Sequence, residues 1–128
     1  MSEFKTLLAV CDLMNKKLVS IKESESIEIS ASRMTAEDVS SLLVLTDDGR
    51  VAGIVTEQDI VRRGVAAGLD ITQTAVSQIM TGDPVHIESD QSIFEARSMM
   101  TGKKLNHLVV VKEKKPVGIL TAANVLGS

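Results

Sequence analysis

The alternation of apolar and polar positions along this chain predicts two successive copies of one short unit. Val51–Val55 is apolar and β-branched, which is typical of a buried strand. Gly53 interrupts this strand and removes a side chain, so another group can approach the backbone closely there. Thr56 then begins a helix that runs toward Gly68. Asp59, three residues after Thr56, completes a capping pattern in which the threonine oxygen accepts from first-turn amides.

The same order of residues returns near the C-terminus. Pro116–Val125 again reads apolar residue, Gly, apolar pair, Thr and then Asn, and Thr121 follows Thr56 by 65 residues. Upstream segments repeat as well: Val76–Met80 resembles Cys11–Met14 at an offset of 66 residues. Two strand–Thr–helix segments in one small chain indicate two copies of one folding unit.

Each half is predicted to contain strand, helix, strand, strand and helix. The turn at 113–116 is one residue shorter than the turn at 47–50, which explains the change of offset from 66 to 65. The first half is preceded by a predicted helix at Ser2–Met14, with an apolar stripe of Phe4, Leu7, Leu8 and Cys11. The remaining predicted elements of the first half are a strand at 18–21, a helix from Ser24 and a strand at 39–45. In the second half they are a strand at 84–87, a helix from Ser92 and a strand at 108–111.

Composition narrows the class of protein. The chain has 128 residues, a net charge of −3 and no Trp or Tyr, and its aromatic residues are Phe4 and Phe94. The core is therefore expected to consist of Val, Ile, Leu and Met, and neither charge nor aromatic content favours nucleic-acid binding. Cys11 is the single cysteine, which favours a reducing compartment. We expect a cytoplasmic protein, because we find neither a signal peptide nor an apolar run long enough to cross a membrane.

The repeated motifs, in this order, resemble a tandem pair of cystathionine-beta-synthase (CBS) domains, also called a Bateman module. The resemblance covers Val10 to Val125. It implies an α+β fold in which two pseudo-twofold-related β-α-β-β-α repeats form one compact module. We assign 1–68 to the first repeat with its N-terminal helix, and 69–128 to the connector and the second repeat. In this family, two clefts between the repeats bind AMP, ADP, ATP or S-adenosylmethionine, and pairs commonly form dimers through their helices.

The resemblance places the main ligand cleft around Thr56 and Asp59. The Thr56 hydroxyl and the amides at the start of its helix suit phosphate oxygens, and the two Asp59 oxygens suit a ribose diol. Ile54 is expected to face the adenine ring. For His107 a structural role at the start of a strand stays open, as does an exposed strand position for His86. The residues expected in this cleft are Gly53, Ile54, Thr56, Asp59, Thr81, Pro84, Val85, His86 and His107.

The second cleft departs from the pattern. Asn124 replaces the acid and accepts through one oxygen, and Ser41 stands where His107 stands in the other repeat. We therefore expect this cleft to bind the same ligand more weakly or not at all. The residues expected there are Asn15, Ser20, Gly118, Ile119, Thr121 and Asn124.

The sequence contains no Gly-x-Ser-x-Gly elbow, no P-loop and no Gly-x-Gly-x-x-Gly motif, and its two histidines are not spaced as a metal pair. We therefore expect no enzyme and no cofactor. One hypothesis is a nucleotide-sensing module that passes the state of its adenosine-containing ligand through a homodimer to an effector protein. The other is a ligand-free module for dimerisation and interaction. The methionines Met34, Met99 and Met100 are expected in the core or in the dimer helices.

Overall fold

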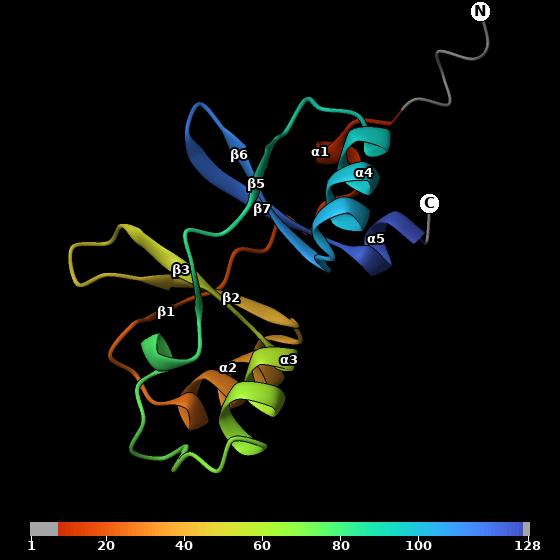
Figure 1. The fold of residues 1–128 in the computed structure, drawn as a ribbon. Helices are drawn as coiled ribbons and strands as arrows, with labels where there is room; N and C mark the ends of the chain where they lie inside the picture. Colours follow the sequence, from red (N-terminus) through yellow and green to blue (C-terminus); the bar gives the residue numbers. More distant parts are fainter. Residues whose placement is uncertain (1–7, 127–128) are drawn as a thin grey trace, which may run out of the picture. The chain divides into compact units, whose positions relative to one another are not determined.

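The computed structural model describes residues 8–126, and the chain divides into two compact units. Unit 2 is the continuous stretch Val19–Pro84. Unit 1 combines the N-terminal segment up to Leu18 with the chain from Val85 onward. Each unit has its own sheet and its own hydrophobic core, and their colours in Figure 1 show that unit 1 draws on both ends of the chain. This division differs from the predicted repeats 1–68 and 69–128, because contacts join the first segment to the second repeat and the connector to the first.

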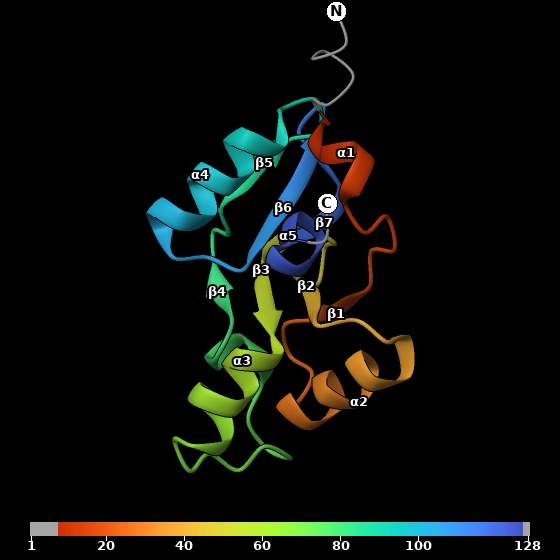
Figure 2. The ribbon, with the colours of Figure 1, turned by 90° about the vertical axis from the view of Figure 1, so that its right-hand side faces the viewer.

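Unit 2 contains a four-stranded sheet with the order β1-β2-β3-β4. The strands β1 (Ser20–Lys22) and β2 (Ser41–Leu45) are parallel and are connected through helix α2 (Ile27–Glu37). The strands β3 (Val51–Thr56) and β4 (Thr81–Gly82) continue the sheet in antiparallel pairs, and Figure 2 shows β4 beside β3. Helix α3 (Glu57–Asp59) continues into η2 (Ile60–Val65), a π-helical segment, and the short 3₁₀ helix η3 (Val76–Gln78) precedes β4.

Unit 1 repeats this arrangement. Its three-stranded sheet has the order β5-β6-β7, formed by β5 (His86–Glu88), β6 (His107–Lys112) and β7 (Lys115–Thr121). Helix α4 (Ile93–Lys103) connects β5 to β6, α5 (Ala122–Leu126) follows β7, and α1 (Val10–Leu13) corresponds to η3. In the place of β4, Asn15 forms an isolated antiparallel bridge with Ile119. The predicted order of strand, helix, strand, strand and helix is therefore confirmed in both halves.

Hydrogen bonds repeat at equivalent positions where a preceding segment joins each unit. The Val10 amide donates to the Gln91 carbonyl at 2.8 Å, and the Val76 amide donates to the Glu25 carbonyl at 2.7 Å. Ala9 forms a bridge with Ser92, just as Ala75 does with Ser26. The N-terminal segment thus does for the second repeat what the connector does for the first, which is the structural basis of the sequence repeat.

The long helices have the same caps. The Ser26 hydroxyl oxygen accepts from the Ile29 amide at the start of α2, and that of Ser92 accepts from the Glu95 amide at the start of α4, both at 3.1 Å. Each helix ends in a left-handed residue, Asp38 or Lys104, with φ of 55° and 56°. A serine oxygen satisfies an otherwise unpaired first-turn amide, and the left-handed residue lets the chain leave the helix.

The cores are aliphatic, as the composition predicted. Side chains from the strands meet the inner faces of the helices, and Phe94 is 68% exposed instead of buried. Met34 and Met100 occupy equivalent core positions on α2 and α4. The largest fully buried hydrophobic side chains are Ile21, Ile27, Leu42, Ile79, Leu108, Leu120, Val10, Val44, Val55, Val76 and Val110.

Two predictions about helices need correction. The helix predicted at Ser2–Met14 covers only Val10–Leu13 within the described residues, because Ala9 is paired with Ser92 in an extended conformation. Residues 2–7, with Phe4 and Leu7, lie outside the described part of the chain. The helix predicted from Thr56 toward Gly68 is widened into a π-helix at Ile60–Val65, for which the sequence pattern gave no signal. No helix in the described part of the chain is both long and apolar enough to cross a membrane.

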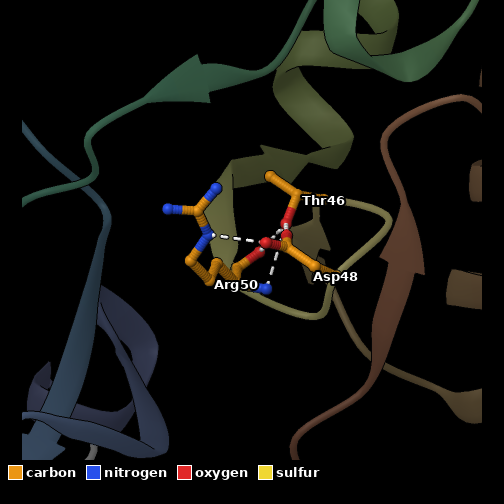
Figure 3. Close-up of polar contacts among 3 residues, drawn as sticks. All are labelled: Thr46, Asp48 and Arg50. Atoms are coloured by element: carbon orange, nitrogen blue, oxygen red, sulfur yellow. Dashed lines mark hydrogen bonds and ion pairs between the residues drawn. The ribbon is translucent and has the colours of Figure 1, made fainter.

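The hairpin between β2 and β3 is held by a small polar cluster (Figure 3). The Thr46 hydroxyl donates to Asp48 Oδ1, and Arg50 Nε lies 3.1 Å from Asp48 Oδ2. The Thr46 bond, with a smaller contribution from Arg50, lowers the pKa of the exposed Asp48 carboxyl below its ordinary value of 3.8. Gly49, with φ of 87°, makes the turn that the sequence predicted at 47–50.

Candidate functional site

Two equivalent capping boxes follow β3 and β7. In unit 2, the Thr56 hydroxyl oxygen accepts from the Asp59 amide at 3.1 Å, and Asp59 Oδ2 accepts from the Thr56 amide at 3.0 Å. In unit 1, the Thr121 hydroxyl oxygen accepts from the Asn124 amide at 3.1 Å, and Asn124 Oδ1 accepts from the Thr121 amide at 2.9 Å. All four side chains are half-buried. Each box therefore fixes two polar side chains at the end of a strand while leaving them accessible.

The atoms left over differ between the two boxes. Asp59 retains Oδ1, an acceptor that receives no hydrogen bond from the described residues, and Thr56 retains its hydroxyl proton for donation. At Asn124 only the oxygen can accept from a backbone amide, so the orientation of the side-chain amide is fixed and Nδ2 is the free end. The first box thus offers a charged acceptor, whereas the second offers N–H donors.

The sheet surrounds the first box with residues of unit 2. Ser41 is the cross-strand partner of Thr56 and is 7% exposed. Thr81 pairs with Ile54 in β4, which confirms that these two predicted residues lie together. Ile54 is itself 7% exposed, so it offers little surface to the adenine ring that the sequence analysis placed against it. It supports the site from within the core.

Gly53 allows a close approach, but by the protein's own chain. A Cβ atom at Gly53 would lie 2.9 Å from Met80 Sδ and closer still to the Thr81 carbonyl oxygen. At the equivalent Gly118, a Cβ atom would lie 2.5 Å from Met14 Sδ. The glycines therefore admit a covering methionine and its strand, which is a structural function that the sequence pattern alone did not distinguish from ligand access.

In unit 1 the residues around the second box are different. His107, which is half-buried, is the cross-strand partner of Thr121. Asn15 exchanges two backbone hydrogen bonds with Ile119, of 2.8 and 3.0 Å, and its side-chain Oδ1 accepts from the Lys17 amide at 3.0 Å. The second box therefore lies in the same unit as Asn15, Gly118, Ile119 and His107.

Within their own units, His107 and Ser41 each flank the box other than the one to which the sequence analysis assigned them. Residue pairs directly opposite in a ladder have side chains on the same face, so His107 accompanies Thr121 and Ser41 accompanies Thr56. The sequence offset could have shown this, because each residue begins the strand that pairs with its own threonine.

The remaining predicted residues belong to the opposite unit from their box. Val85 and the exposed His86 lie in unit 1, whereas Ser20, at the start of β1, lies in unit 2. Pro84, half-buried, is the last residue of unit 2. That residues of both units line one shared cleft stays a prediction.

A profile of the CBS domain matches residues 10–66 and 76–128, which is nearly the whole chain. The chain belongs to the CBS domain family. It is 30% identical to hypoxic response protein 1 of Mycobacterium tuberculosis over 114 residues, which cover 89% of this chain and 80% of that protein. A solved structure of an uncharacterized conserved protein from Pyrococcus horikoshii is 33% identical, with a TM-score of 0.87 over 93% of this chain and 89% of that one.

The CBS comparison extends to a structure with bound metal. Hypoxic Response Protein I, solved with two coordinated zinc ions, is 28% identical to this chain, with a TM-score of 0.77 over 94% of this chain and 98% of that one. Between residues 8 and 126 of the present chain, no three His, Cys, Asp or Glu side chains are grouped to hold a metal ion. CBS pairs are generally regulatory ligand-binding modules, and the two repeats here have the CBS fold.

Proposed function

We propose that this CBS pair is a regulatory module that binds an adenosine-containing ligand at the Thr56–Asp59 box. The observation that carries this proposal is the division of labour at Asp59. One carboxylate oxygen holds the capping box together, and the other remains available beside a hydroxyl that still has its proton to donate. A carboxylate oxygen accepts hydrogen bonds from ribose hydroxyls, and the Thr56 hydroxyl donates to a phosphate or carboxylate oxygen.

The second box supports a division between the two sites. Asn124 presents N–H donors in the place where Asp59 presents an acceptor, so it does not provide a charged acceptor for a ribose diol. A hydrogen bond to a charged group contributes roughly 1.5–3 kcal/mol, against about 1 kcal/mol for a neutral pair. We therefore propose one dominant nucleotide site per chain, at Asp59, and a weaker or empty second site.

In this proposal the protein is no enzyme, and ligand occupancy is passed to an effector protein. CBS-only proteins are typically regulatory, which supports this assignment. The alternative is a ligand-free interaction module, and the exposed apolar residues on the helices favour it as the second candidate. Leu126, Phe94 and Val61 are 81%, 68% and 59% exposed. An exposed apolar side chain on a helix is a feature of interaction surfaces when several such residues gather.

A thermal-denaturation panel with AMP, ADP, ATP, S-adenosylmethionine and NADH tests the proposal. A ligand at about 100 times its dissociation constant adds roughly 2.7 kcal/mol to stability, or about 10 °C at roughly 4 °C per kcal/mol. We expect a shift of this size with at least one adenosine-containing ligand, and a much smaller one in Asp59→Asn. If none of the five compounds shifts the transition at millimolar concentration, the ligand-free module is the better description.

A further inference from the structure

Two open grooves lie on the helices of the two units, at equivalent positions. The groove of unit 1 has a volume of about 440 Å³ and runs between α4 and α5, and that of unit 2 has a volume of about 400 Å³ and lies between α2 and the helix after β3. Their floors are made of the same kinds of side chain, since Met34, Val39 and Ile60 in unit 2 correspond to Met100, Leu105 and Val125 in unit 1. The fold thus provides the same apolar groove twice.

The charged rims of the grooves are opposite in sign. The unit 1 groove is lined by Arg97 and Lys104, both exposed cations. The unit 2 groove is lined by Asp38 and Glu57, both exposed anions. Lys104 and Asp38 are equivalent residues, and they have the same left-handed backbone at the ends of α4 and α2. The chain therefore has a basic groove and an acidic groove of matching shape.

Other charged groups on these helices do not reverse this contrast. Arg63 on η2 donates to the carbonyl oxygens of Ile79 and Met80, at 2.9 and 3.3 Å, and so is directed to the connector. Neither Arg62 on η2 nor Glu95 on α4 lines a groove. Leu126, 81% exposed, lines the basic groove, and Val61, 59% exposed, holds the equivalent position next to Ile60 on the floor of the acidic one.

We propose that a second copy of this chain covers both grooves, with the basic groove of each copy on the acidic groove of the other. Pairing of like grooves would bring cations against cations and anions against anions, whereas pairing of unlike grooves brings opposite charges together at both contacts. Two copies make both contacts at once in a closed two-fold dimer. This pairing is independent of nucleotide binding, so either proposal can fail without the other.

Asp38 and Lys104 provide a matched exchange that tests the pairing. Asp38→Lys makes both grooves basic, and Lys104→Asp removes the cation that the acidic groove would face. Each change places at one site the residue that already occupies the same backbone conformation at the other. The double variant Asp38→Lys/Lys104→Asp restores opposite signs with the two grooves exchanged.

Sedimentation equilibrium of the full chain in low salt measures the outcome. We expect a dimer for the wild type, a dissociation constant about tenfold higher for each single variant, and recovery in the double variant. High salt should weaken the wild-type dimer, because exposed charges are screened. Circular dichroism melting curves serve as the control for folding. A monomeric wild type overturns the proposal. So do single variants that dimerise as well as the wild type, which is the result expected for pairing of like grooves, and so does a double variant that stays dissociated.

Discussion

Exchanging the acid and the amide between the two capping boxes tests the assignment of the nucleotide site. The variants are Asp59→Asn and Asn124→Asp, which are close to isosteric. The structure contains its own control, because Asn124 already makes the same two capping bonds as Asp59, at 2.9 and 3.1 Å against 3.0 and 3.1 Å. We therefore expect both variants to fold with little change in stability. Alanine at position 59 is less informative, since losing a cap costs about 1 kcal/mol by itself.

The expected change in affinity follows from the atom that is left over in each box. Asp59→Asn keeps the oxygen that holds the box and replaces the free Oδ1 by an N–H donor. A ligand diol thus loses a charge-assisted bond of roughly 1.5–3 kcal/mol and regains at most a neutral one of about 1 kcal/mol. The difference corresponds to about a tenfold loss of affinity, at about 1.4 kcal/mol per decade. Asn124→Asp should strengthen the second site by a similar factor.

Isothermal titration calorimetry measures this with the compound that gives the largest thermal shift in the panel of five. The titrations compare the wild type, both single variants and the double exchange, in which the stronger site should move to unit 1. Asn124→Ala should leave the stronger site almost unchanged, whereas Asp59→Ala should remove most binding. The reasoning is refuted if Asp59→Asn binds as tightly as the wild type, or if Asn124→Ala removes the stronger site.

Three further predictions concern the fold. Gly53→Ala should lower the free energy of unfolding by about 1–3 kcal/mol in urea denaturation, because its Cβ would collide with the covering strand, whereas Gly102→Ala, with no heavy atom within 4 Å, should be neutral or stabilising; equal effects would contradict this. Lys114→Gly should raise the free energy of unfolding by about 1 kcal/mol, because Lys114 has φ of 66° in a two-residue turn, and an unchanged urea midpoint would argue against strain there. The carboxyl of Asp48 should titrate by NMR below 3.8 and move up in Thr46→Val. Since its folded pKa is depressed, its contribution to stability is present above pH 3.8 and is lost as the pH falls through the folded pKa; an unchanged titration in Thr46→Val would exclude this cause.

The sequence was sufficient for the order of elements because each repeat has the same local signals. The Thr-x-x-Asp and Thr-x-x-Asn spacings predicted both capping boxes, and the helix caps at Ser26 and Ser92 follow from similar local chemistry. Such signals depend on residues within one turn of each other. They carry no information about which distant segment completes a sheet.

The parts that the sequence did not predict depend on long-range pairing. Nothing local indicates that the segment at Asn15 pairs with Ile119, 104 positions later, or that Met14 covers Gly118. The polarity of Asn124 was also missed, because the count of its acceptors did not include the one that the backbone of Thr121 already uses. Placing His107 beside Thr121 required the register of β6 and β7.

The two-part composition of unit 1 has a consequence for how the protein is made on the ribosome. The residues of unit 2 leave the ribosome as one uninterrupted stretch, so its sheet can close while the rest of the chain is still being translated. Residues 8–18 are translated earlier, yet the carbonyl groups that receive their amides, at Ser89, Gln91 and Ile119, are among the last to appear. The first segment to be synthesised must therefore wait, unpaired, for nearly the whole of translation before its own unit can fold.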